Sequence, residues 1–544
     1  MHDYLKQQIE QALKSMAPDI EIPEITIEKP RSPEHGDAAT NVALTLAKIL
    51  KDNPRSIAGK IAGHIDVSSG YISSVEVAGP GFINFRFSGT WLKDRLESAF
   101  HAGRDYGKGR HLEGKKVQVE FVSANPTGPL TVGHGRNAVL GDTIARLLEW
   151  TGADVQREYY FNNAGRQMRV LAESVRARYL QSIGHDTDFP EGGYEGLYIT
   201  EIAKKVREQH GDQLLGEEHL HVFRKAAEEG IFEDIKRTLA RMNITMDTFF
   251  NENTLYEDGS IDKIIELLRE KGLIYEQDGA TWFKTTTFGK EKDTVLIKSS
   301  GEPTYRLPDI AYHINKLERG FDLAIDIFGA DHIATYPDVV AGVQACGLDS
   351  SRIDVIVYQF VTIVKDGKPF KMSTRKANFV TLDELMDEVG ADVTRFFFLM
   401  RAPGTHLEFD INEAKQAGEK NPVFYLQYAH ARIQSIMRKV RNHYDFTGAT
   451  PDFALLTHEA EVTLIKRLLE FPEMVTQTAM QREPHKLITY LNDLATAFHK
   501  FYHDCRILGE EEPLARARTE LLTVTANVLA NGLGILGITA PDRM

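Results

Sequence analysis

The stretch NPTGPLTVGHGRN, residues 125–137, joins an extended pattern to a helical one. Before it, KVQVEFV alternates apolar and polar side chains with the period of a β-strand. After it, apolar residues recur at helical spacing as far as Gly152, which suits a helix C-terminus. The stretch is therefore a strand-to-helix turn, with His134 near the start of the helix. Free backbone N–H groups and the helix dipole favour phosphate there, and Gly133 and Gly135 would let a ligand approach the backbone.

The turn matches neither of the two common phosphate-binding loops, because it is not GxGxxG and not GxxxxGK[ST]. On this stretch alone, an ordinary connection in which His134 only caps a helix is an equally good interpretation. Other parts of the chain have to decide between the two.

The bulk properties narrow the class of protein. The 544 residues can form about three or four domains, and 42% apolar with 26% charged residues is typical of a globular chain. No window approaches the roughly 18 continuous apolar residues of a membrane span, and residues 1–16 predict a packed helix, not a signal peptide. Cys346 and Cys505 fit no metal or disulfide pattern, so we expect a cytoplasmic protein without a structural metal. The net charge of −14 disfavours indiscriminate nucleic-acid binding but leaves room for a local basic surface.

Three regions differ in pattern. Residues 1–110 mix helical segments with the strand-like GFINFRF, which predicts an α+β domain. Residues 111–410 alternate strands and helices, with VQREYYF, DTVLIKS, DLAIDIFG and IDVIVYQFV as sheet segments. This alternation predicts an α/β domain with a doubly wound, Rossmann-like parallel sheet, interrupted by a mainly helical insertion at about 170–280. Residues 411–544 predict an all-α bundle.

A second unusual segment, GKPFKMSTRKANFVTLDEL, follows the strand pattern IDVIVYQFV. A cluster of charged residues by itself usually indicates a solvent-exposed loop. This one surrounds Met372 and Ser373 with five cations, namely Lys365, Lys368, Lys371, Arg375 and Lys376.

Together the two segments resemble class I aminoacyl-tRNA synthetases, whose HIGH and KMSKS signatures match TVGH and KMSTR in part. In that class the substrate carboxylate attacks the α-phosphate of ATP, so the protein aligns reactants and neutralises phosphate charge without a nucleophile of its own. The resemblance implies that Mg-ATP is a substrate and that no metal is held by the protein. It implies catalytic roles for His134, Lys371 and Thr131, and ATP contacts from these three with Gly133, Met372 and Ser373.

Two positions depart from the class signatures. Thr131 replaces the first histidine, and it can donate one hydrogen bond but carries no charge. Thr374 replaces the second lysine, and we expect Arg375 or Lys376 to take its place.

The resemblance narrows to the arginyl-tRNA synthetase family and covers nearly the whole chain. It includes HGDAATNVALTLAK in an N-terminal domain that contacts the tRNA corner in relatives, then YYFNNAGRQM, TYRLPDIAYH, YLQYAHARIQSI and the ending NVLANGLGILGITAPDRM. The expanded first signature comprises Ala124, Asn125, Pro126, Thr127, Gly128, Pro129, Leu130, Thr131, Val132, Gly133 and His134.

The family implies an arginine site. A guanidinium is permanently charged and planar, and carboxylates hold it best. Tyr305 and Asp309 are four residues apart, on one face of a helix that we expect to begin near Pro308. The resemblance implies that Asp309 binds the guanidinium and that Tyr305 packs against it or bonds it. It further implies that Glu252 is a second acidic contact, and that Glu120 and Asn125 hold the ammonium and carboxylate.

The implied partners are tRNA(Arg), L-arginine and ATP, with no membrane, and we expect a monomer. For RNA we expect single-stranded bases to stack on Tyr425, Tyr428 and His430, with cations beside them. A solvated helix face is the alternative. The cations are Arg432, Arg438, Lys439 and Arg441.

Two other functions compete with arginine–tRNA ligation. One is a synthetase for another amino acid, or a small-molecule nucleotidyl transferase, which the carboxylates and the long terminal regions oppose. The other is a catalytically silent RNA-binding relative, which only Thr131 and Thr374 favour.

Overall fold

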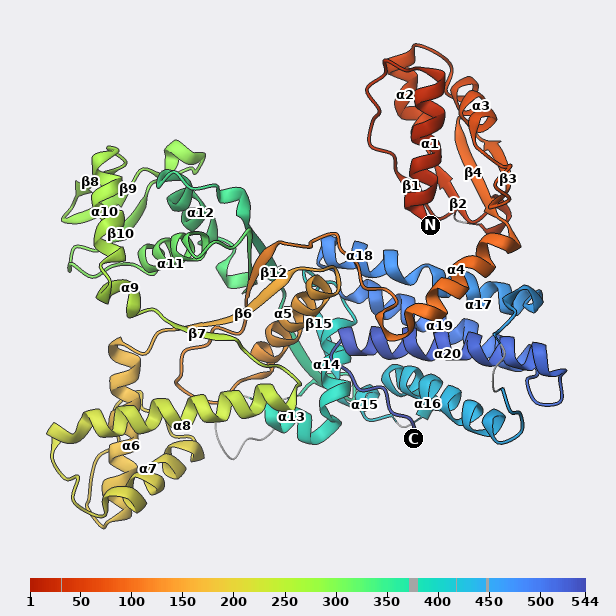
Figure 1. Ribbon diagram of the computed structural model, residues 1–544. Helices are drawn as coiled ribbons and strands as arrows, with labels where there is room; N and C mark the ends of the chain where they lie inside the picture. Colours follow the sequence, from red (N-terminus) through yellow and green to blue (C-terminus); the bar gives the residue numbers. More distant parts are fainter. Residues whose placement is uncertain (31, 371–379, 417, 447–449) are drawn as a thin grey trace.

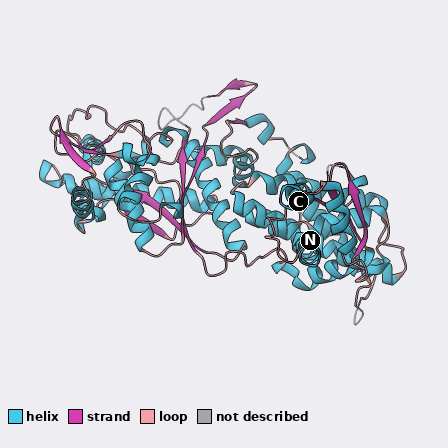
Figure 2. Cartoon of the chain, turned by 90° about the horizontal axis from the view of Figure 1, so that it is seen from above, coloured by secondary structure: helices cyan, strands magenta, loops and turns pink. Residues whose placement is uncertain are grey.

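A computed structural model describes residues 1–30, 32–370, 380–416, 418–446 and 450–544. The chain is elongated and mostly helical, and both termini lie in the half that holds the C-terminal bundle (Figures 1 and 2). Within these residues the strands form four separate sheets.

The central sheet is parallel throughout and has the order β12-β11-β5-β6-β7. Its first strand along the chain, β5, lies in the middle, so the order reverses between β5 and β11. Ligands of such sheets bind at the carboxyl ends of the strands next to that reversal. The doubly wound prediction is confirmed. The strands are β5 (Lys116–Glu120), β6 (Asp154–Phe161), β7 (Thr248–Asn251), β11 (Leu323–Gly329) and β12 (Ile353–Tyr358).

Helices cover both faces of this sheet. On one face α5 (Val132–Trp150) packs so closely that a Cβ on Gly141 would lie 2.2 Å from Cγ of Phe121, and only glycine permits that approach. The opposite face is covered by α11 (Arg306–Glu318), with α12 (Tyr336–Ala345) beside it.

The insertion after β6 is helical at first. It contains α6 (Gly165–Ser182), α7 (Leu197–His210) and α8 (Leu220–Arg241), and α8 packs through Phe232 on β6 and β7. After β7 come α9 (Thr254–Glu257), α10 (Ser260–Glu270) and a three-stranded antiparallel sheet of β8 (Ile274–Gln277), β9 (Ala280–Phe283) and β10 (Thr294–Ile297).

One predicted sheet segment lies elsewhere than expected. DTVLIKS forms β10, which pairs antiparallel with β9 in the small sheet and takes no part in the parallel one. The connection from β9 to β10 is short, whereas a parallel pairing needs a crossover of a dozen residues or more. The alternation of strand and helix patterns did not carry this information.

The N-terminal region projects from the body and carries a sheet of order β1-β2-β4-β3 (Figure 1). Its base is fixed to the bundle, where Lys466 Nζ lies 2.5 Å from Asp37 Oδ1. The elements are α1 (His2–Met16), β1 (Ile27–Glu28), β2 (Ala38–Thr40), α2 (Val42–Leu50), α3 (Pro54–His64), β3 (Ile72–Ala78), β4 (Phe82–Phe87) and α4 (Gly89–Ala102).

The C-terminal bundle follows a small sheet of β13 (Val361–Lys365), β14 (Lys368–Pro369) and β15 (Leu407–Asp410). Between β14 and β15 lie α13 (Leu382–Val389) and α14 (Ala391–Leu399), and after β15 comes α15 (Ile411–Ala414). The bundle helices are α16 (Pro422–Arg441), α17 (Glu459–Leu469), α18 (Phe471–Gln481), α19 (His485–Asp504) and α20 (Glu512–Ile535).

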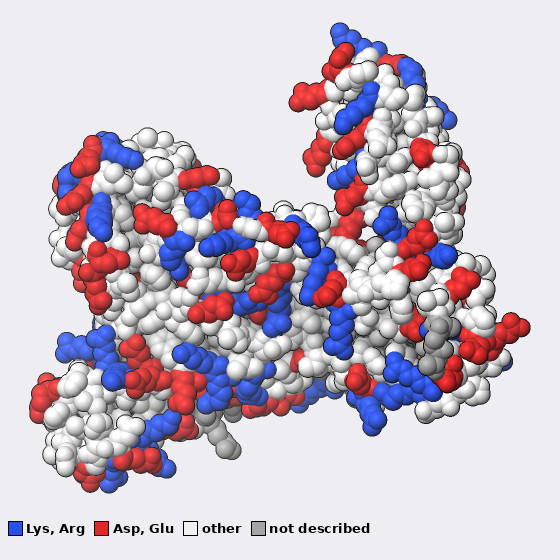
Figure 3. Space-filling model, viewed as in Figure 1, with Lys and Arg blue, Asp and Glu red and all other residues white. Residues whose placement is uncertain are grey.

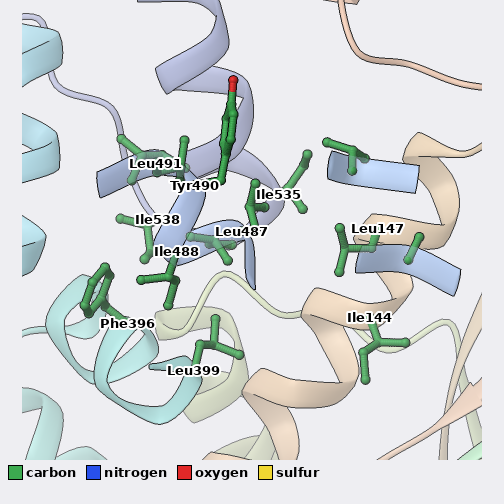
Figure 4. Packing of buried hydrophobic residues seen from close by; sticks show 14 of the residues in the cluster. Ile144, Leu147, Phe396, Leu399, Leu487, Ile488, Tyr490, Leu491, Ile535 and Ile538 are labelled. Carbon is green, nitrogen blue, oxygen red and sulfur yellow. The ribbon is translucent and has the colours of Figure 1, made fainter. Parts of the chain in front are cut away.

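The bundle and the sheet domain share one core. Figure 4 shows Ile144 and Leu147 of α5 facing the same cluster as Phe396 of α14, Leu487 of α19 and Ile535. All five side chains are buried. The packing therefore joins the helix that begins at the signature turn to the helices of the bundle.

A buried arginine reinforces this junction. Arg395 of α14 donates from Nη2 to Asp142 Oδ2 of α5 at 2.7 Å, from Nε to the carbonyl of Leu536 at 2.8 Å, and from Nη1 to the carbonyl of Met242 at 2.6 Å. One side chain thus connects α14, α5, the bundle and the end of the helical insertion.

Two general expectations can be compared with the described part of the chain. No helix there is long and apolar enough to cross a membrane. Cys346 and Cys505 are free thiols.

Candidate active site

The turn after β5 is strained at its first two residues. Val122 has φ 70° and Ser123 has φ 44°, a region that side chains, and β-branched ones above all, rarely adopt. Asn137 of α5 holds this turn, because its Oδ1 accepts the N–H of Val122 at 2.6 Å and its Nδ2 donates to the carbonyl of Ile327 at 2.8 Å. Asn137 therefore ties the ends of β5 and β11 together at the strand-order reversal.

His134 lies in the first turn of α5, as predicted. Its Nδ1 is 3.1 Å from the backbone N–H of Thr131, the N-cap residue. A backbone N–H can only donate, so Nδ1 accepts and the proton of the neutral ring resides on Nε2. Burial lowers the pKa of His134. The capping interpretation and the functional one are thus compatible, since the cap fixes Nε2–H as a hydrogen-bond donor.

The two glycines of the turn serve different purposes. A Cβ on Gly133 would meet only Thr131 Oγ1, at 3.7 Å, so nothing within the described chain requires glycine there. A Cβ on Gly135 would lie 2.6 Å from Leu382 Cδ1 and 2.9 Å from Phe398 Cε2. Gly135 is therefore needed for packing against α13 and α14, and the expectation that it admits a ligand is wrong.

Glu120 ends β5 and is 4% exposed. Its Oε1 accepts from Ser123 Oγ at 2.8 Å and its Oε2 from Lys316 Nζ at 2.6 Å. Burial raises the pKa of Glu120, and the ammonium of Lys316 opposes that shift.

The charges of two further carboxylates, Glu252 and Asp309, interact with each other, and that of Asp309 also interacts with Glu120. Glu252, directly after β7, is 7% exposed and accepts from Tyr160 Oη and from Asn162 Nδ2, each at 2.7 Å. Burial raises its pKa. Asp309 on α11 is half-buried, and desolvation raises its pKa to about 7, with the charges of Glu120 and Glu252 acting in the same direction. Within the described residues no hydrogen bond to its carboxylate is found.

The remaining predicted contacts are more open. Asn125 is exposed, with its Oδ1 3.2 Å from the N–H of Asn162 and its Nδ2 3.3 Å from Gln167 Oε1. Tyr305 is 82% exposed, so its ring does not pack beside Asp309. The helix begins at Arg306 and not near Pro308, because the N–H that proline lacks has no helical partner in the first turn anyway.

The second signature, with Lys371, Met372, Ser373, Thr374, Arg375 and Lys376, lies outside the described residues. The chain that follows it is joined to the first signature. The N–H of Leu382 donates to the carbonyl of Leu130 at 2.8 Å, and the N–H of Val132 donates to the carbonyl of Val380 at 3.3 Å. Backbone pairing thus holds two segments together that are about 250 residues apart in sequence.

Sequence reasoning did not identify several of these residues. The most conspicuous are Lys316, His313 and Asp326, which form buried ion pairs between α11 and the sheet beside Glu120. The signal was present as an aspartate inside the apolar strand DLAIDIFG and as charged residues on the buried face of a helix. These residues can be recognised as partners only once it is known that α11 packs on β5 and β11.

The predicted RNA surface is only partly exposed. Arg432 lies over the rings of Tyr428 and Tyr502, at 5.5 and 4.7 Å from their centroids. His430 is 4% exposed, with Nδ1 2.9 Å from the carbonyl of Pro541, so it cannot stack on a base and that expectation is wrong. Arg438 donates to the carbonyl of Asp542, while Lys439 and Arg441 are exposed.

The charges of the remaining surface are mixed. The face shown in Figure 3 carries Lys and Arg interspersed with Asp and Glu, and it is broadly hollowed between the N-terminal region and the lobe of β8 to β10. Among the described side chains there is no group of three or more potential metal ligands.

A parallel sheet with this strand order, a capped histidine at the turn after its central strand and an all-α bundle at the C-terminus define a class I aminoacyl-tRNA synthetase. Family models agree along the chain. "Arginyl tRNA synthetase N terminal domain" matches residues 3–87, "tRNA synthetases class I (R), catalytic domain" residues 95–397, and "DALR anticodon binding domain" residues 426–544.

Individual relatives give the same result. The chain is 54% identical to an arginine–tRNA ligase of Salinibacter ruber over the full length of both, and 50% identical to one of Desulfotalea psychrophila over 95% of this chain and 94% of the relative. The fold matches that of a Thermus thermophilus arginyl-tRNA synthetase with a TM-score of 0.79, covering all of both chains at 23% identity. The chain belongs to the arginyl-tRNA synthetase family, whose members are aminoacyl-tRNA ligases.

Proposed function

We propose that the chain activates L-arginine with ATP to give arginyl-adenylate and transfers the arginyl group to the terminal ribose of tRNA(Arg). The observation that carries the amino-acid specificity is the group of Glu120, Glu252 and Asp309 at the carboxyl ends of β5 and β7 and on α11. Arginine brings two cations into this space, its ammonium and its guanidinium. Carboxylates in a poorly solvated pocket favour such a substrate over uncharged analogues.

Each end of the substrate has its own set of contacts in this proposal. Glu120 holds the ammonium and Asn125 the carboxylate, while Asp309 and Glu252 bind the guanidinium. Tyr305, whose ring is exposed without substrate, packs against the guanidinium or bonds it. Glu252 is held in place by Tyr160 and Asn162, which leaves its orientation fixed before the substrate arrives.

The activation step is an in-line displacement at the α-phosphate. The arginine carboxylate attacks the α-phosphate of Mg-ATP, the bond to the bridging oxygen breaks, and pyrophosphate leaves with its electron pair. His134 donates from Nε2 to phosphate oxygens as charge develops on them, and Thr131 adds one hydroxyl donor. Gly133 leaves the backbone open for the nucleotide. Lys371 neutralises charge on the phosphates, Met372 and Ser373 contact ATP, and Mg²⁺ arrives with the nucleotide.

The same proposal extends to the partners and domains. Residues 1–110 contact the tRNA corner, residues 111–410 carry the catalysis with a helical insertion at about 170–280, and residues 411–544 bind the anticodon. Arg432, Arg438, Lys439 and Arg441 meet the RNA phosphates. We propose a cytoplasmic monomer that needs bound tRNA(Arg) before it activates arginine.

The test is the charging of total tRNA with each of the twenty amino acids by the full chain. We expect charging with arginine alone. Lys371→Ala is expected to lower the rate by about 100-fold or more, and Asp309→Asn to raise the KM for arginine while leaving that for ATP unchanged. Tight tRNA binding without charging by any amino acid would instead identify a silent RNA-binding protein.

A further inference from the structure

The two ends of the proposed arginine site come from different elements of the fold. Glu120 ends the central strand β5, whereas Asp309 lies in the first part of α11. Nothing in the strand itself fixes how far the helix stands along the sheet. The distance between the two carboxylates therefore depends on the contacts that join α11 to β5 and β11.

Lys316 is the first of these contacts. Its side chain is fully buried, and Nζ lies 2.6 Å from Glu120 Oε2 and 2.5 Å from Asp326 Oδ1. A buried ammonium between two carboxylates has a single satisfactory position, because any shift leaves a charge unpaired in a poorly solvated space. Lys316 follows Asp309 by two helical turns, so it fixes the position of that residue along the helix axis.

His313 is the second contact, and it reaches Asp309 directly. Its Nδ1 lies 2.7 Å from the backbone carbonyl of Asp309, and its Nε2 lies 2.7 Å from Asp326 Oδ2. Both partners are acceptors, so the ring satisfies both only with a proton on each nitrogen. The imidazole thereby connects the peptide of Asp309 to the end of β11.

We propose that Lys316 and His313 are positioning residues that set the length of the amino acid which the enzyme accepts. Together with Asp326 they hold the ammonium-binding Glu120 and the guanidinium-binding Asp309 at one separation, and this inference rests on the function proposed above. Side chains longer or shorter than that of arginine by one methylene misplace either the guanidinium or the carboxylate that attacks ATP.

A contact of the same chemistry on the same helix serves as a control. Arg319, at the end of α11, donates from both terminal nitrogens to Glu158 of β6, at 2.6 and 2.7 Å. It also ties the helix to the sheet, but it bonds neither Glu120 nor the peptide of Asp309. If the ion pairs matter only for stability, removing Arg319 and removing His313 have similar consequences for catalysis.

The experiment compares L-arginine with L-homoarginine, which is one methylene longer, in tRNA(Arg)-dependent ATP–pyrophosphate exchange by the full chain. A well-fitted pocket discriminates one methylene by about 10- to 200-fold in kcat/KM. His313→Asn keeps a donor near the Nδ1 position and loses the Asp326 contact, whereas His313→Gln keeps a donor near Nε2. His313→Asn and His313→Gln each break one side of the connection between the Asp309 peptide and Asp326, so we expect both to lower the arginine preference at least about fivefold. Arg319→Gln is expected to keep it within about twofold.

Two results would overturn the proposal. One is an unchanged arginine preference in His313→Asn, and the other is an equal loss of preference in Arg319→Gln. Thermal unfolding of each variant is measured alongside. If His313→Asn does not fold, Lys316→Arg tests the same separation between Glu120 and Asp309 with a longer cation. It is likewise expected to lower the preference for arginine over homoarginine. Asp309→Asn distinguishes a failure of this positioning proposal from a failure of the proposed arginine site. An unaltered KM for arginine in that variant would refute the assignment of Asp309 to the guanidinium.

Discussion

The affinity of the enzyme for arginine, in the absence of ATP, is expected to depend on pH in a way that identifies Asp309. Its carboxyl group has a pKa raised to about 7 by burial and by the neighbouring charges of Glu120 and Glu252. A guanidinium stays protonated over the whole physiological range and binds the carboxylate form. Arginine binding must therefore displace a proton from Asp309 whenever the pH lies below about 7.

The size of the effect follows from the pKa. The fraction of enzyme with an ionised Asp309 rises from about one tenth at pH 6 to about nine tenths at pH 8, so the Kd for arginine at pH 6 is roughly tenfold weaker than at pH 8. Binding at pH 6 releases about 0.9 proton and binding at pH 8 about 0.1. Burial also raises the pKa of Glu252, which acts in the same direction at lower pH.

Titration calorimetry of arginine into the full chain with tRNA(Arg) and without ATP measures both quantities, since buffers of different ionisation enthalpy report the protons released. Leaving out ATP removes the titration of its own phosphate. Asp309→Asn is the control, and it is expected to bind arginine more weakly with little pH dependence between 6 and 8. A Kd in the unaltered chain that is constant over this range would refute the reasoning, because Asp309 would then be ionised before arginine binds.

Three further predictions concern the turn and the bundle. Gly133→Ala is expected to leave the free energy of unfolding unchanged or higher and to raise the KM for ATP. Gly135→Ala would overlap Leu382 and is expected to destabilise the fold by about 1–3 kcal/mol in urea unfolding. Equal stabilities of the two variants would contradict the packing role of Gly135. Asn137→Ala removes the partners of the Val122 N–H and the Ile327 carbonyl and is expected to lower the free energy of unfolding by about 2–4 kcal/mol. In ATP–pyrophosphate exchange its kcat is expected to fall by a larger factor than its KM changes. A loss of stability without a loss of kcat would mean that the strained turn has no part in activation. Arg432→Ala is expected to weaken tRNA(Arg) binding, measured by filter binding, while arginine binding stays the same, and an unchanged Kd for tRNA would remove this residue from the RNA surface.

The sheet, the class and the family could be predicted from the sequence because their signals are local. The turn at His134 and the strand pattern before it are contiguous, and the family signatures are long. The cluster of Lys316, His313 and Asp326 could not be predicted in this way, since its members are remote from Glu120 in sequence and meet only after α11 has packed on the sheet.

Two misplaced expectations have the same origin. The segment DTVLIKS has the pattern of a strand, but a pattern does not state which strand will be its neighbour. Tyr305 and Asp309 have the spacing of one helical face, yet Tyr305 falls at the N-cap and points its ring to solvent. The individual site assignments therefore stay predictions until substrate affinities of the variants are measured.

The junction at Arg395 bears on how such a chain can be divided. Its sequence reads as separate modules in tandem, which invites the removal or exchange of the last one by cutting near residue 420. Such a cut would remove the carbonyl of Leu536 and leave Nε of the buried Arg395 without its hydrogen-bond acceptor. It would also expose the side chains of Ile144, Leu147 and Phe396, which the bundle covers. The C-terminal bundle thus covers part of the core of the catalytic domain. A chimaera is expected to stay active only if the replacement bundle carries residues that match those of α5 and α14 at this junction.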